Sequence, residues 1–179
     1  MSKVLIVYYS LTGNTRFIAE ILKDSMKADL LELKPINELN PDSGTKFVWG
    51  GAQATMKMKP KLKPIEINPL EYDLVIIGTP VWAWTITPPI RSFLSMFNLT
   101  EKKVALLTCS AGTGDKAMER FKKTLKGSNV IGQIQFKFAS QSQVEQEITG
   151  YKVRAKAWAS ELLENLNGGN LYGTVQEIA

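Results

Sequence analysis

The chain has 179 residues, of which 44% are hydrophobic and 22% are charged, a composition typical of a folded globular domain and not of a disordered chain. Its 22 basic and 17 acidic side chains give a net charge of +5. No apolar run approaches the roughly 18 residues that span a bilayer, so we expect no membrane span. The chain contains no histidine, which removes the commonest transition-metal ligand and general base, and we expect no metal site. Cys109 is the only cysteine, which excludes an internal disulfide and fits a cytoplasmic protein.

Apolar strands alternate with amphipathic helices along the chain. The predicted elements, in chain order, are strand 4–8, helix 15–26, strand 29–33, a short helix near 45–58, strand 72–78, a helix after Pro89, strand 103–109, a helix after Asp115, strand 129–138 and a last helix over about 144–166. Because the middle strands are apolar throughout, they are expected to be buried on both faces. The fold class predicted is therefore α/β, a three-layer doubly wound sheet of five parallel strands. Strand 129–138 alternates in polarity and is placed at an edge.

We expect one domain, 1–179, with a loose tail at about 167–179. A lysine-rich insertion at about 34–64 interrupts the alternation of strands and helices, and its six lysines outnumber its two acidic residues by four. Such a segment could bind nucleic acid or an acidic partner. A solvated loop is the simpler interpretation, because lysines without arginine or interleaved aromatics are a weak signal. We expect no nucleic-acid partner.

Three unusual loops follow strands at their carboxyl ends, at residues 10–15, 79–89 and 110–115. In a doubly wound sheet, ligands bind outside the carboxyl ends of the strands, where the strand order reverses. We therefore expect the three loops to form one site.

The first loop, "SLTGNT", places small polar residues around Gly13 before a helix. A helix N-terminus offers unpaired N–H groups and a positive dipole end, which together hold an anion. The motifs GxxxxGK[ST] and GxGxxG are absent, and the loop contains no lysine. Uncharged donors alone suggest a bound monophosphate rather than a phosphate that is transferred. The alternative is that the serine and threonines merely cap the helix.

This loop closely resembles the T/S-x-T-G-x-T phosphate loop of the flavodoxins, and its position after the first strand is the same. The resemblance extends over roughly residues 3–166 and is closest to longer flavodoxin-like proteins, in which a lysine-rich stretch precedes "YDLVIIGTPVW". It implies the strand order 2-1-3-4-5 and flavin mononucleotide (FMN) as the cofactor. It also implies that the FMN phosphate is held by Ser10, Leu11, Thr12, Gly13, Asn14 and Thr15.

The second loop, "TPVWAWTITPP", carries two tryptophans two positions apart. Large aromatics at the carboxyl end of a strand suit stacking on a flat heteroaromatic ring, and the prolines stiffen the loop. The resemblance implies that this segment lies beside the isoalloxazine ring, through Thr79, Pro80, Val81, Trp82, Ala83 and Trp84. Alternatively, either tryptophan fills a gap against the following helix.

The third loop, "SAGTGD", would lie along the pyrimidine side of the flavin in a flavodoxin, with Ser110, Ala111 and Gly112 as the matching positions. Alternatively, Thr113 or Asp115 simply caps the next helix. Many flavodoxins place a tyrosine in this loop, and this chain has none. Cys109, beside the loop, is expected to be buried and inert, because no histidine is present to activate its thiol.

The favoured function is an FMN-binding electron-transfer flavoprotein that shuttles electrons between redox protein partners, as a monomer or homodimer. The alternative is an NAD(P)H-dependent quinone or nitroaromatic reductase that uses FMN. A third possibility is a binding module that has lost its flavin. The chain lacks a second nucleotide-binding motif, which favours the carrier. Its positive charge is expected to stabilise the anionic reduced flavin.

Overall fold

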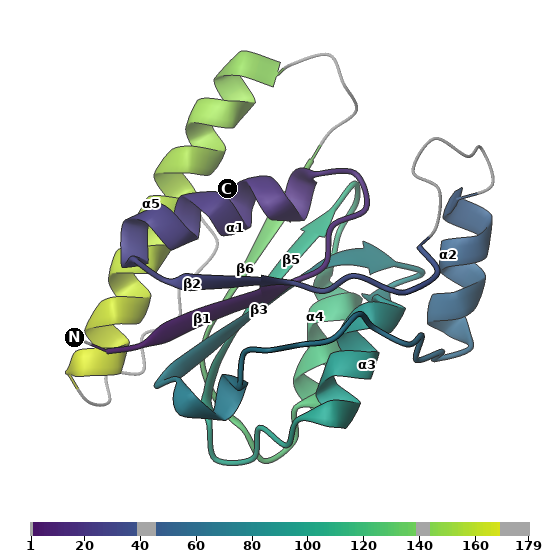
Figure 1. Ribbon diagram of the computed structural model, residues 1–179. Helices are drawn as coiled ribbons and strands as arrows, with labels where there is room; N and C mark the ends of the chain where they lie inside the picture. Colours follow the sequence, from purple (N-terminus) through teal and green to yellow (C-terminus); the bar gives the residue numbers. More distant parts are fainter. Residues whose placement is uncertain (1, 39–45, 139–143, 169–179) are drawn as a thin grey trace.

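The structure is a computed structural model that describes residues 2–38, 46–138 and 144–168 (Figure 1). A parallel sheet forms its centre, with the strand order β2-β1-β3-β5-β6. These strands are β1 (Val4–Tyr8), β2 (Asp29–Glu32), β3 (Leu74–Trp82), β5 (Lys103–Ser110) and β6 (Asn129–Lys137). The predicted fold class is confirmed, and the predicted strand order matches this path. Strand β6 lies at an edge, as predicted.

Helices cover both faces of the sheet, which gives the three layers visible in Figure 1. One face carries α1 (Asn14–Met26) and α5 (Val144–Asn167), and the other carries α3 (Pro88–Met96) and α4 (Asp115–Thr124). Helix α2 (Lys46–Thr55) stands to one side of the sheet, where the sequence predicted a short helix, and a 3₁₀ turn, η1 (Pro69–Glu71), precedes β3.

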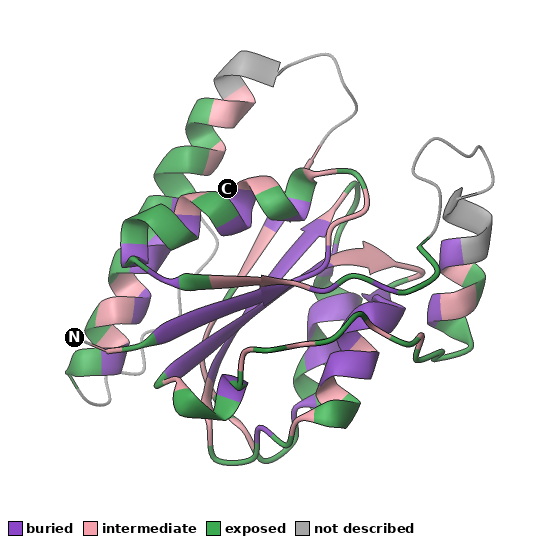
Figure 2. Ribbon diagram, viewed as in Figure 1, coloured by how far each residue is buried: buried purple, intermediate pink, exposed green. Residues whose placement is uncertain are grey.

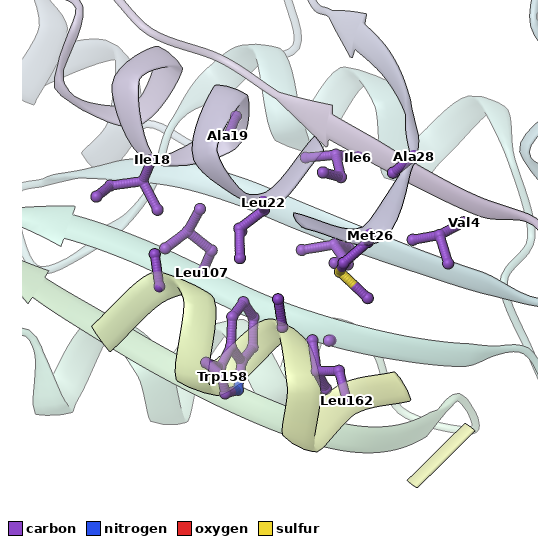
Figure 3. Packing of buried hydrophobic residues seen from close by; sticks show 14 of the residues in the cluster. Val4, Ile6, Ile18, Ala19, Leu22, Met26, Ala28, Leu107, Trp158 and Leu162 are labelled. Carbon is purple, nitrogen blue, oxygen red and sulfur yellow. The ribbon is translucent and has the colours of Figure 1, made fainter. Parts of the chain in front are cut away.

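The alternation of side chains along β1 divides the core into two clusters. Ile6 packs with Leu22 of α1 and Trp158 of α5 on one face, as Figure 3 shows. On the other face, Leu5 and Val7 pack with residues of α3 and α4. Because successive strand residues point to opposite faces, a strand buried on both sides must be apolar throughout. Figure 2 shows the central strands buried along their length.

The second loop was predicted as a stiff loop without regular secondary structure, but it contains a short pair of strands. Strand β3 continues to Trp82, and Thr85–Ile86 forms a short strand, β4, that pairs antiparallel with it. Val81 lies opposite Ile86, and Trp82 lies opposite Thr85. The missed element consists of two residues whose pairing depends on a tight turn, a pattern too short for sequence periodicity to reveal.

The structure does not test two expectations, the loose tail and the single-domain assignment. Most of the predicted tail, residues 169–179, lies outside the described residues, and the single-domain assignment stays a prediction. In the described ranges, no helix combines the length and apolarity needed to cross a bilayer.

Candidate functional site

The first loop leaves the N-terminus of α1 without a side-chain cap. Gly13 occupies the N-cap position with φ 95°, in the left-handed region, and no side chain there bonds to the helix. The first turn of α1 contains no acidic residue. Capping by the loop's serine and threonines is therefore not what this part of the structure shows. The first turn presents N–H groups and the positive end of the helix dipole, an arrangement that favours a bound anion.

The polar side chains of this loop divide into two groups. Thr12 and Asn14 are exposed, and Ser10 is half-buried, so their donors face outward. Thr15 is 1% exposed, and its hydroxyl has no oxygen or nitrogen hydrogen-bond partner among the described residues; the weakly bonding Cys109 thiol is its polar neighbour. A buried hydroxyl without a partner costs about 1–3 kcal/mol, and an oxyanion bound at the helix terminus is the kind of group that relieves this cost.

Arg16, the charged residue nearest the loop, is already paired. Its guanidinium bonds to the Glu32 carboxylate, which also lies 3.4 Å from the Lys34 ammonium. This ion pair is the largest reason that the pKa of Arg16 is raised. The Arg16 charge is therefore already neutralised by Glu32, and anion binding by uncharged donors of the first loop stays a prediction.

The base of the second loop is fixed by a buried hydroxyl pair. The Thr79 hydroxyl donates to the Pro80 carbonyl at 2.9 Å and lies 3.0 Å from the Thr87 hydroxyl. The Thr87 backbone N–H donates to the Thr79 hydroxyl at 3.2 Å. Thr79 is fully buried, so its hydroxyl holds the hairpin closed and does not face outward.

The tip of this hairpin is a strained two-residue turn. Ala83 has φ 47° and Trp84 has φ 56°, and two positive φ values in succession define a type I′ turn. Such a turn normally uses Asn or Gly, and each residue held in this region costs about 1 kcal/mol or more. The Trp84 side chain is 64% exposed. Strain combined with an exposed aromatic ring marks this tip as a candidate contact for a ligand or a partner.

The two predicted tryptophans have different surroundings. The Trp82 ring meets the Tyr9 ring edge-on, with centroids 5.6 Å apart and planes at 87°. Gly50 of α2 lies against the Trp82 ring, where an added Cβ would come within 3.0 Å of the ring carbons Cε3 and Cζ3. Trp82 is thus partly enclosed by protein, whereas Trp84 is open to solvent.

Two arginine side chains, which no sequence pattern pointed to, bond to the hairpin. Arg120 of α4 donates to the Trp84 carbonyl at 3.1 Å, and Arg91 of α3 donates to the Thr85 hydroxyl at 2.6 Å. The Arg91 Nε is buried and has no hydrogen-bond partner in the described ranges. Burial first, and then the charge of Arg120, lowers the pKa of Arg91. These charges make the surroundings of the second loop favourable to a negative group. Only the tertiary structure brings them there, because they come from two separate helices.

The third loop is stabilised by its own polar groups. The Ser110 hydroxyl donates to the Gly112 carbonyl at 2.6 Å, and the Gln135 side-chain amide lies 3.4 Å from that hydroxyl. Ala111 and Gly112 are exposed. The alternative interpretation, in which Thr113 or Asp115 caps α4, is wrong, because Gly114 is the N-cap residue. The first turn of α4 therefore also lacks a side-chain cap at its N-cap position.

Cys109 is buried, as expected, with 4% of its surface exposed. Burial raises the pKa of its thiol to about 12, and the neighbouring Thr15 hydroxyl only partly opposes this shift. The thiol is therefore protonated at neutral pH and is a poor nucleophile.

The three loops lie together at the end of the sheet formed by the carboxyl ends of its strands. Tyr8 pairs with Gly78, and Thr79 pairs with Thr108, so β1, β3 and β5 end side by side at their carboxyl ends. The structure thus brings together the predicted positions 10–15, 79–84 and 110–112. Tyr9, which donates to the Glu38 carboxylate at 2.8 Å, was not predicted, since only the contact with a distant residue reveals it. In the described part of the chain, no group of three or more potential metal-ligating His, Cys, Asp or Glu side chains occurs.

The fold and site define a doubly wound α/β protein with an uncapped helix N-terminus after its first strand and two further loops at the carboxyl ends of β3 and β5. A flavodoxin family model matches residues 3–152, and the chain therefore belongs to the flavodoxin family. No curated protein matches the chain.

Solved structures agree with this assignment. A flavoprotein from Lactobacillus acidophilus NCFM, solved in complex with FMN, is 29% identical; the match covers 75% of this chain and 93% of that one, with a TM-score of 0.67. The apo-form of the flavoprotein from the same organism is 31% identical over 82% of this chain and 97% of that one, with a TM-score of 0.61. Oxidised flavodoxin 2 from Bacillus cereus is 21% identical over 89% and 99%, with a TM-score of 0.55, and it supports the fold alone.

Proposed function

We propose that this protein binds FMN at the carboxyl edge of its sheet and carries electrons between redox proteins. The observation that carries the proposal is the N-terminus of α1, which follows the left-handed Gly13 and has no side-chain cap. A helix terminus with unpaired N–H groups suits a phosphate dianion. The FMN complex of the Lactobacillus acidophilus relative supports the choice of ligand.

The residues of the three loops take different parts in this proposal. Residues 10–15 hold the phosphate, with the polar side chains of the half-buried Ser10 and the exposed Thr12 and Asn14 adding to the backbone N–H groups. Residues 79–84 and 110–112 flank the ring. The flavin, when bound, supplies the redox chemistry, and the protein sets its orientation and its electrostatic surroundings.

The charges around the second loop favour a negatively charged ring. Arg91 and Arg120 both bond to the hairpin, and neither forms an ion pair with a described carboxylate. Positive charge near a redox group stabilises its reduced anionic form and raises its reduction potential. We therefore expect a higher potential for the fully reduced couple than in an acidic relative. A potentiometric titration that gives a very low potential would contradict this part of the proposal.

FMN binding is tested by comparing FMN with riboflavin, which carries the same ring without the phosphate. Titration of flavin-free protein, followed by quenching of flavin fluorescence, should show FMN binding about 100-fold tighter or more, because several charge-assisted hydrogen bonds distinguish the two ligands. Equal affinities would refute a phosphate site at the first loop.

Electron carriage is separated from reductase activity by mixing the FMN-loaded protein with NADH or NADPH in a stopped-flow instrument. We expect slow bleaching of flavin absorbance, because the sequence holds no second nucleotide-binding motif. Rapid bleaching, with turnover of a quinone or nitroaromatic acceptor, would instead establish the reductase.

A further inference from the structure

Two extended segments on either side of α2 pair outside the main sheet. Pro35 and Leu62 form an antiparallel bridge, with the Ile36 N–H donating to the Lys61 carbonyl at 2.9 Å and the Lys63 N–H donating to the Lys34 carbonyl at 2.8 Å. In Figure 1 these segments are the stretch after β2 and the stretch that returns from α2 toward η1. The pairing joins the two described segments of the lysine-rich insertion that flank α2.

The alternation of side chains sorts this pair into a buried face and an exposed face. Pro35 is buried and Leu62 packs against the core, so their neighbours point the other way. Lys34 and Lys63 lie directly opposite each other across the two segments, and Lys61 lies opposite Ile36. All four of these neighbours are exposed. We call the exposed lysines of this region the lysine ladder: Lys34, Lys57, Lys59, Lys61 and Lys63.

The lysine ladder has little neutralising charge. Residues 56–63, "MKMKPKLK", contain four lysines and no acidic residue. Within the described chain, the Lys34 ammonium is the one ladder cation in an ion pair, 3.4 Å from Glu32, which also binds Arg16. Like charges that face each other across paired strands are destabilising, so this arrangement costs stability unless an acidic group approaches it.

Exposed apolar side chains are interspersed with these charges. Met56 is 74% exposed, Ile36 is 58% exposed and Met58 is 44% exposed. Methionine adapts to irregular surfaces and is enriched at protein interfaces, where apolar contacts accompany a polar rim. A surface of this kind suits a folded protein partner.

The lysine ladder also borders the candidate flavin site. The Leu33 N–H donates to the Tyr8 carbonyl at 2.7 Å, which fixes the ladder's first segment at the carboxyl end of β1. The Ser92 hydroxyl of α3 donates to the Pro60 carbonyl at 2.7 Å, and Gly50 of α2 contacts Trp82. A protein docked on the ladder would therefore lie near the carboxyl end of β1 and near α2, the helix that contacts Trp82.

We infer that the lysine ladder is the docking surface for an acidic redox protein, on which a cluster of carboxylates meets the lysines and a small apolar patch meets Ile36, Met56 and Met58. The inference deepens the proposed function and rests on it, since an electron carrier needs a partner protein. Single-stranded nucleic acid fits the surface less well: residues 56–63 contain neither the aromatic side chains that stack on bases nor arginine.

The test uses the full-length FMN-loaded protein and an acidic plant-type [2Fe–2S] ferredoxin as the probe, both oxidised. Isothermal titration calorimetry at low and at physiological ionic strength measures their affinity. The double variant Lys61→Gln/Lys63→Gln is compared with Lys152→Gln/Lys156→Gln, which removes two exposed lysines from α5. Both variants lower the net charge from +5 to +3, so they differ only in where the charge is lost.

We expect the ladder variant to bind the ferredoxin about fivefold more weakly at low ionic strength and to lose most of the salt dependence. The α5 variant should stay within about twofold of the parent. Equal losses in the two variants, or no loss in the ladder variant, would overturn the inference. Tighter, ladder-dependent binding of a single-stranded oligonucleotide would also overturn it.

A further variant, Lys63→Glu, separates docking from folding. Placing a carboxylate opposite Lys34 should raise the melting temperature by roughly 1–3 °C while weakening ferredoxin binding, because a repulsive pair becomes an attractive one. A variant that fails to fold would lose both its thermal unfolding transition and its ferredoxin binding, and circular dichroism would detect the missing secondary structure. Flavin absorbance is recorded for each sample, and flavin-free protein is titrated alongside. Loss of FMN binding with intact ferredoxin binding would count against the proposed function and leave the docking surface supported.

Discussion

Replacing Gly13 by alanine tests whether one backbone dihedral positions the first loop. Gly13 has φ 95°, and an added Cβ would meet no atom within 4 Å, so steric overlap with other residues does not contribute. The cost of the substitution is therefore the cost of the left-handed conformation itself, about 1–2 kcal/mol for an L-residue. For a chain of this length, that cost corresponds to a fall in melting temperature of roughly 3–6 °C.

We expect the effect on FMN binding to be larger. Alanine relieves its strain by moving φ toward negative values, and this rotation turns the N–H groups of the first turn away from the phosphate. Loss of one or two charge-assisted hydrogen bonds, at about 1.5–3 kcal/mol each, would weaken FMN binding by about 10- to 100-fold or more. Riboflavin affinity should change much less, because riboflavin has no phosphate. Both are measured by fluorescence titration of the flavin-free protein.

Gly127 provides a matched control. It has the same φ of 95°, and an added Cβ would make only an ordinary contact of 3.4 Å with Thr100. It lies between α4 and the amino end of β6, whereas the three loops follow the carboxyl ends of strands parallel to β6. Gly127→Ala should lose a similar amount of stability and keep its affinity for FMN. The reasoning would be refuted if Gly13→Ala bound FMN as tightly as the parent, or if both variants lost the same affinity.

Three further outcomes are expected from other parts of the structure. Gly50→Ala should destabilise the protein by roughly 1 kcal/mol or more in denaturant titrations, because the added Cβ would press on the Trp82 ring. Gly51→Ala should instead stabilise α2 by about 0.5–1 kcal/mol, because its Cβ would meet no atom within 4 Å and alanine favours a helix. Lys27→Gly should raise the melting temperature by about 1–4 °C, because Lys27 ends α1 with φ 51° and glycine adopts that conformation without strain. An unchanged or lower melting temperature would count against this account. The Cys109 thiol should resist alkylation in the native protein, since burial raises its pKa to about 12 from 9.0. Because the pKa is raised, the folded state keeps the thiol proton to a higher pH than the unfolded state does. The thiol's contribution to stability is therefore complete below about pH 9 and is lost as the pH rises toward 12. Cys109→Ala should reduce this loss of stability in unfolding measured as a function of pH.

The sequence by itself determined the order of elements and the nature of the first loop. Local patterns carry this information: apolar runs such as residues 72–78 identify strands buried on both faces, and the residues around Gly13 predict an anion-binding turn. The right-handed connection of parallel strands leaves few topologies, so the sheet could be anticipated from the alternation alone. For the same reason, the three loops could be assigned to one edge.

Only the tertiary structure decided how individual side chains act. Three side chains of the predicted site have different surroundings: the Thr79 hydroxyl holds the hairpin closed, Trp82 is partly enclosed by Tyr9 and Gly50, and Trp84 is exposed. These differences depend on contacts between residues far apart in the chain, which no local pattern encodes.

The same holds for charge. The sequence shows that residues 34–64 are rich in lysine, but the bridge between Pro35 and Leu62 is what sets Lys34 opposite Lys63 on an exposed face. Likewise, α3 and α4 bring Arg91 and Arg120 to the hairpin from separate parts of the chain. Composition fixes how much charge the protein carries, whereas strand pairing and helix packing fix where that charge can meet a ligand or a partner.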